Sequence, residues 1–213
     1  MKIKIASIIT IFIFVGMCGF ASAYTIGFDY ALDGNNYTSN YAGAIVETFE
    51  SSPIWVWSGD YAIVTGSVGG RYAAPFGESS ADATSYVTVP SDLSSGYADV
   101  SLGATYNYFG LWWGSVDDYN TLSFYKDGGE VASFGGYSVA PPADGDQGSD
   151  VTNLYVNFYD LPDFDSFRMT STSYAFEADN IAVGTAPVPE PSTLLLLGSG
   201  LLGLGWYGWK RKK

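Results

Sequence analysis

Short runs of alternating apolar and polar positions fill the chain between residues 24 and 186, and this period of two predicts half-buried β-strands. Leu122 and Phe124 in one run, and Phe167 and Met169 in another, should face a core while their neighbours face solvent. No run carries the period of an amphipathic helix. The runs that we expect to form strands are 44–50, 61–68, 84–89, 97–108, 121–125, 131–134, 151–159, 166–170 and 174–183.

Turn-forming residues separate these runs and indicate how the strands connect. Asp127-Gly128-Gly129 stands between two runs and should form a hairpin turn. Clusters of Gly, Pro and Ser at 66–70, 90–96 and 141–149 should form loops. Many short strands within one segment predict an all-β domain at 24–186, an antiparallel β-sandwich of jelly-roll-like type.

The first 23 residues have the pattern of a secretory signal peptide, so we do not expect them to be part of the folded domain. Lys2 and Lys4 give a positive start, and 5–20 is almost wholly apolar. Ala21-Ser22-Ala23 has the small residues that a signal peptidase needs, so the mature chain should begin at Tyr24. The alternative is an uncleaved membrane anchor.

The last 27 residues, 187–213, contain a proline-rich break, a second apolar run and a basic end. Pro189-Glu190-Pro191 makes a stiff, extended break. An apolar run follows at 193–209 and is just long enough to predict a transmembrane helix. Four basic residues, 210–213, close the chain and should stay cytoplasmic. Topology explains this basic cluster better than nucleic-acid binding does.

The segment Val188-Pro189-Glu190-Pro191-Ser192, with the Leu/Gly-rich helix and the basic end, resembles the PEP-CTERM sorting signal. The resemblance implies that a membrane protease, exosortase, recognises Pro189, Glu190 and Pro191 and processes the tail. It also implies an exported protein of a Gram-negative bacterium, held transiently in the inner membrane by the C-terminal helix. The mature protein would then reach the cell surface or the extracellular matrix. The alternative is an ordinary single-pass anchor.

Composition and charge exclude several functions for the body. The chain has no histidine and one cysteine, which excludes Ser/His/Asp triads, histidine metal sites and a disulfide framework. The formal net charge is −13, and within 24–186 three basic residues face 21 acidic ones, a balance of −18. Such a surface argues against a nucleic-acid partner.

Calcium is the cofactor that these acids suggest, because a hard cation prefers several oxygen ligands. One candidate is the loop that carries Asp144, Asp146 and Asp150; its alternative is a solvated acidic loop. The other is the pair Glu50 and Asp179. The segments around Glu50 and Asp179 resemble the first and last strands of carbohydrate-binding-module-like jelly rolls, in which a calcium ion ties the two strands together. The alternative for Asp179 is a hydrogen-bonded turn or bulge.

Carbohydrate is the ligand that the aromatic residues suggest, because sugar rings stack on exposed aromatic faces. Trp55 and Trp57 are two apart and should share a face of a strand, whereas Trp112 and Trp113 should point to opposite faces. Trp55, Trp57 and Trp113 are the candidate sugar-binding residues, and the alternative is that they fill the core. The segment from 113 to 125 also resembles part of the ectodomain of exosortase-dependent surface proteins.

Catalysis is not expected. A glycosidase needs only two carboxylates, but Asp117-Asp118 and Asp163 with Asp165 stand in no recognisable catalytic setting. The sequence therefore predicts a structural or adhesive protein of an extracellular polysaccharide layer. A carbohydrate-binding protein is the alternative, and a secreted glycosidase, which would need a cleft with two carboxylates, is a weaker one.

Overall fold

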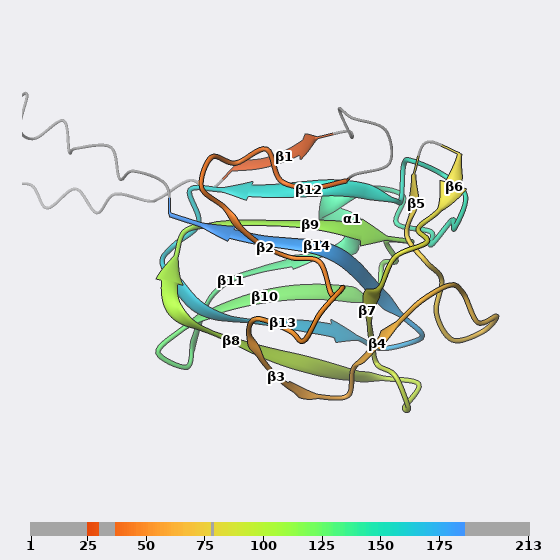
Figure 1. Ribbon diagram of the computed structural model, residues 1–213, viewed down its shortest axis with the longest axis horizontal. Helices are drawn as coiled ribbons and strands as arrows, with labels where there is room; N and C mark the ends of the chain where they lie inside the picture. Colours follow the sequence, from red (N-terminus) through yellow and green to blue (C-terminus); the bar gives the residue numbers. More distant parts are fainter. Residues whose placement is uncertain (1–24, 30–36, 78, 186–213) are drawn as a thin grey trace, which may run out of the picture.

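Two antiparallel β-sheets pack face to face in the computed structural model, which describes residues 25–29, 37–77 and 79–185 (Figure 1). This arrangement confirms the predicted all-β sandwich. The finer prediction of a jelly-roll strand order stays a prediction. The signal peptide predicted at 1–23 and the sorting signal predicted at 187–213 lie outside the described residues. Among the residues that are described, no helix is long and apolar enough to cross a membrane.

The larger sheet has seven strands, and every neighbouring pair is antiparallel. Strand β14 (Phe176–Gly184) lies in its middle and pairs with three neighbours. Along the sheet the order is β1 (Thr25–Asp29), β12 (Leu154–Tyr159), β9 (Tyr108–Gly114), β14, β7 (Tyr86–Val89) and β4 (Ala62–Val64), with β2 (Ile45–Glu47) paired to β14.

The smaller sheet has five strands and is built around the long strand β13 (Phe164–Ser171). Its order is β11 (Gly129–Gly135), β10 (Asn120–Lys126), β13, β8 (Gly96–Tyr106) and β3 (Val56–Gly59). A two-stranded hairpin, β5 (Phe76–Gly77) with β6 (Ser80–Ala81), and one helical turn, α1 (Gly136–Val139), complete the described elements.

Aromatic side chains from both sheets fill the space between them. Phe109 of the larger sheet contacts Phe124 and Phe167 of the smaller one edge to face, with ring centroids 5.0 and 4.9 Å apart. Edge-to-face contacts suit the charge distribution of aromatic rings. The predicted alternation is visible in β13, where Phe167 and Met169 are fully buried and the residues between them reach the surface.

Every predicted run coincides with a strand, but five strands are not covered by any run: β1, β3, β5, β6 and β9. The hairpin at Asp127-Gly128 is confirmed: it joins β10 to β11, and both residues have positive φ. Strand β9 was not predicted: the run 97–108 was expected to end at residue 108, where β9 begins. All seven residues of β9 are buried. A strand covered on both faces has no alternation for sequence reasoning to detect.

The outer face of the larger sheet is covered by the chain itself. Tyr37 stacks on Trp112 with ring centroids 4.4 Å apart, and Tyr41 stacks on Tyr108 at 3.9 Å. The adjacent tryptophans do point to opposite faces: Trp113 lies in the main core, and Trp112 belongs to this outer cluster. Polar side chains on the outer face of β14 are therefore buried by covering loops.

Candidate functional site

The three tryptophans predicted to bind sugar lie in the core. Trp113 has no exposed surface and stacks on Phe176 with ring centroids 4.2 Å apart. Trp55 and Trp57 share a face, as their spacing predicted, but that face packs edge-on against Phe167 inside the sandwich. A sugar ring needs an exposed aromatic face, so the burial of Trp55, Trp57 and Trp113 favours the alternative, that they fill the core.

The acidic loop predicted to bind calcium is exposed, and its acids do not converge. Asp144 forms an isolated antiparallel bridge with Asp117. The Oδ1 atom of Asp146 accepts a hydrogen bond from the backbone N–H of Gly148 at 2.9 Å, and Asp150 is exposed. Nowhere in 25–29, 37–77 and 79–185 do three or more acids or cysteines form a group that could hold a metal ion.

Asp179 on the outer face of β14 is buried among other acids. Its side chain is 2% exposed, and its Oδ1 atom has no hydrogen-bond partner. Burial first, and then the negative charges of Asp82, Glu50 and Glu47, raise the pKa of Asp179 to about 8. A cation beside Asp179 would offset both effects, which is the chemistry that the Glu50–Asp179 prediction requires.

The acids near Asp179 already accept hydrogen bonds from backbone N–H groups. The two carboxylate oxygens of buried Glu47 accept hydrogen bonds from the backbone N–H groups of Phe49 and Ile54, at 3.0 and 2.6 Å. Glu50 accepts one from the backbone N–H of Ser85 at 2.7 Å. The donor types therefore suit calcium, but an ion at Asp179 would need the side chain of Glu50 or Asp82 to turn toward it.

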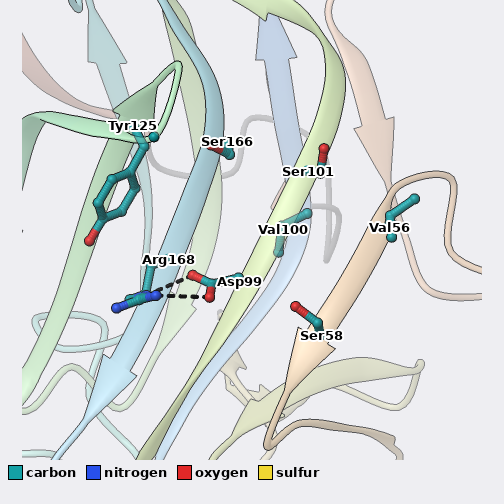
Figure 2. Close-up of a pocket in the computed structure, with 9 residues that line it drawn as sticks. Val56, Ser58, Asp99, Val100, Ser101, Tyr125, Ser166 and Arg168 are labelled. Carbon is teal, nitrogen blue, oxygen red and sulfur yellow. Dashed lines mark hydrogen bonds and ion pairs between the residues drawn. The ribbon is translucent and has the colours of Figure 1, made fainter.

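A hollow of about 290 Å³ lies on the outer face of the smaller sheet (Figure 2). At its centre Arg168 of β13 donates two hydrogen bonds to Asp99 of β8, from Nε at 2.6 Å and from one terminal nitrogen at 2.8 Å. The guanidinium also lies 4.1 Å from the ring centroid of Tyr97 and 5.6 Å from that of Tyr125. Serines from β3, β8 and β13 line the remainder.

The charged residues in the hollow of Figure 2 stabilise the sheet, and their polar groups are not free to bind a ligand. Arg168 and Asp99 lie directly opposite each other across β13 and β8 and satisfy each other in a two-point pair. The guanidinium occupies one face of Tyr97 and so takes a surface on which a sugar could stack. We assign this group to cross-strand stabilisation.

A second cavity, of about 260 Å³, lies where loops gather at the β5–β6 end of the sandwich, and polar side chains line it. Glu177 of β14 lies at its base, fully buried, with Oε1 accepting a hydrogen bond from the backbone N–H of Ala73 at 2.8 Å. Burial first, and then the charge of Asp117, raise the pKa of Glu177 to about 8. Burial likewise raises the pKa of Asp117. We call this cavity the acidic pocket.

Sequence reasoning missed Glu177 and set Asp117 aside. The signal for Glu177 was its place in an otherwise apolar last strand, two residues before Asp179 and therefore on the same face. Asp117 was considered with Asp118 as a pair of adjacent acids on a strand. The structure places Asp117 instead in the turn between β9 and β10, facing Asp144 across an isolated bridge.

Comparison with known proteins identifies a motif in the tail. A family model for the PEP-CTERM protein-sorting motif matches residues 187–212. No curated protein and no solved structure matches the chain significantly. The chain therefore carries, at its C-terminal end, the motif by which exosortase-dependent proteins are exported and sorted to the cell surface.

Proposed function

We propose that this protein is a structural or adhesive component of an extracellular polysaccharide layer, delivered there by exosortase acting on its C-terminal motif. The match to the PEP-CTERM motif at 187–212 is the observation that carries the proposal. Before processing, the apolar segment 193–209 holds the protein in the inner membrane of a Gram-negative cell. After processing, the body is released to the surface or the matrix.

The body suits a passive role in such a layer. Trp55, Trp57 and Trp113 lie in the core between the sheets with most of the described phenylalanines, so these aromatic rings contribute to stability rather than to a broad sugar-binding surface. Its acidic surface, with a balance of −18 over 24–186, keeps the domain soluble and repels anionic polymers unless cations bridge them.

Calcium stabilisation of the body is the second part of the proposal. It is supported by the unpartnered Oδ1 atom of Asp179 and the unpartnered Oδ2 atom of Asp82. It is also supported by the negative charge that Glu50 places near Asp179. In this proposal the ion joins Asp179 of the last strand to Glu50 of the loop after β2, and so ties an early segment of the body to its end.

The sorting step predicts a processing defect when the motif is changed. Replacing Glu190 with alanine should leave an unprocessed, membrane-bound form, because the protease loses the carboxylate between the two prolines. The readout is the apparent mass and the membrane or surface fraction of the protein in a host that has exosortase. Glu130→Ala, which removes an exposed carboxylate of β11, is the matched control and should be processed normally. Normal processing of Glu190→Ala would refute the sorting role of the motif.

A further inference from the structure

The acidic pocket has walls of fixed shape rather than loose loops. The segment 143–147 is joined to the turn after β9 by two backbone hydrogen bonds, from Asp118 N–H to the carbonyl of Ala143 at 2.9 Å and from Gly145 N–H to the carbonyl of Val116 at 3.1 Å. Gly145 has φ +67°, and a Cβ atom there would lie 2.3 Å from Oδ1 of Asp117. Only glycine therefore lets this wall approach the carboxylate.

Two buried polar atoms of residues that line the pocket have no partner. They are Oε2 of Glu177, whose side chain is 2% exposed, and Oγ of Ser115, which is 3% exposed. A buried polar atom without a hydrogen bond costs on the order of 1–3 kcal/mol. Both atoms belong to residues that line an open pocket, so a ligand bound there is a candidate source of the missing hydrogen bonds.

The lining determines which ligand fits. The carboxylates of Asp117 and Asp144 and the buried acid Glu177 line the pocket with a single cation, Arg71. Carboxylates accept hydrogen bonds, so the ligand has to be rich in donors and must not be an anion. A single metal ion does not fit, because no three acids within the described ranges come close enough to share one. A volume of about 260 Å³ suits one compact organic unit.

Aromatic rings add a second requirement. Tyr72, Tyr119 and Tyr174 also line the pocket, and the hydroxyl of Tyr119 is fixed by donating to the backbone carbonyl of Tyr174 at 2.7 Å. Rings beside acceptors suit a molecule with an apolar face and a rim of donors. A sugar unit with hydroxyl or amine substituents has both features, whereas a simple amine lacks the rim and a uronic acid carries the wrong charge.

The position of the pocket also fits a ligand in the layer. Strand β14 begins at Phe176, beside the pocket, and its nine residues end at Gly184, which places the two ends roughly 25–30 Å apart. In Figure 1 the end of β14 lies at the left and the β5–β6 hairpin at the right. The tail that carries the sorting motif starts just after Gly184. The pocket is therefore at the end of the sandwich far from the start of the tail.

From these observations we infer that the acidic pocket binds a neutral or amine-bearing sugar unit of the polysaccharide around the protein. The buried carboxyl group of Glu177 and the hydroxyl of Ser115 bind some of the ligand's hydroxyl or amine groups, and Asp117 and Asp144 bind others. The inference rests on the proposed location of the protein in a polysaccharide layer. The sugar site that we infer here is thus not at the core tryptophans but elsewhere in the fold.

Isothermal titration of the full-length protein with three oligosaccharides tests the inference. The detergent must have no sugar headgroup. The probes are tetramers of glucose, of glucosamine and of mannuronic acid. We expect the first two to bind at least tenfold more tightly than the third, because the pocket carries excess negative charge. Equal binding of all three, or no binding of the first two, would overturn the inference.

Ser115→Ala separates binding from folding. Removing a buried hydroxyl that has no partner should leave the unfolding temperature unchanged or higher, and should weaken binding of the glucose tetramer at least fivefold. Ser166→Ala, in the hollow of Figure 2, is the matched control and should bind like the wild type. Unchanged affinity in Ser115→Ala would overturn the assignment of the pocket. Ser115→Ala should still have its tail processed normally. The binding assay and the processing assay therefore distinguish failure of this inference from failure of the sorting function.

Discussion

Raising the pH from 5 to 8 in the presence of a chelator should lower the stability of the protein by about 1 kcal/mol or more per pH unit. The cause is the pair Glu177 and Asp179, whose pKa values burial raises to about 8 in the folded chain. In the unfolded chain both groups lose their protons near pH 4. Between pH 4 and 8 the folded state thus binds more protons, and its stability falls as the pH rises.

Acids with a lowered pKa do not contribute to this decline. Backbone and side-chain hydrogen bonds lower the pKa of Asp60, and hydrogen bonds from Asp127 and Lys126 lower that of Asp165. The stability contributed by groups with a lowered pKa is present above the unfolded value and is lost only as the pH falls below about 4. The decline between pH 5 and 8 therefore reports the acids whose pKa burial raises: Glu177 and Asp179, with Asp117 acting in the same direction.

Thermal unfolding of the full chain, followed by circular dichroism at several pH values, measures the effect. Glu177→Gln and Asp179→Asn should each reduce the slope, because each removes one titrating group and keeps the size of the side chain. Asp150→Asn, at an exposed loop position, is the control and should keep the wild-type slope. A wild-type profile that stays flat from pH 5 to 8 would contradict the burial of these charges.

Calcium should reverse the part of this decline that comes from Asp179. A cation binds the ionised carboxylate, so adding calcium at pH 8 should raise the unfolding temperature and have little effect at pH 5. Asp179→Asn should abolish the response, and Glu177→Gln should retain it. Absence of a calcium-dependent shift in the wild type at pH 8 would refute the proposed calcium site and leave the pH prediction standing.

Replacing Trp113 with alanine should lower the free energy of unfolding by about 3–5 kcal/mol. The ring is fully buried, stacks on Phe176 at 4.2 Å and belongs to the core between the sheets, so its removal leaves a large cavity. Chemical unfolding measures the change. Tyr137→Ala, at a side chain that is 66% exposed, is the control and should change stability by less than about 0.5 kcal/mol. A Trp113→Ala variant with wild-type stability that no longer binds polysaccharide would restore the sugar-binding interpretation.

The sequence predicts the sandwich well because each half-buried strand shows its alternation. Leu122 and Phe124 face the core as expected, and Asp127-Gly128 turns the hairpin. Strand β9 escaped prediction because both of its faces are covered, so no polar position marks its outer side. Whether that outer side is covered depends on Tyr37 and Tyr41, which lie far along the chain from β9.

The candidate site was less predictable for a related reason. Residue type suggested that tryptophans bind sugar, but burial decides whether a ring is available, and burial is set by packing against residues such as Phe167 and Phe176. The acidic pocket joins Asp117, Asp144 and Glu177 from three separate segments. No local spacing links these residues, because the approach of the 143–147 loop to the turn after β9 brings them together.

The mass of the mature protein, isolated from the surface of producing cells and measured intact, tests the central claim most directly. The proposal predicts a chain that lacks the apolar segment 193–209 and the basic residues 210–213, because exosortase removes them after recognising Pro189-Glu190-Pro191. A surface protein whose mass includes the chain through Lys213 would contradict exosortase processing.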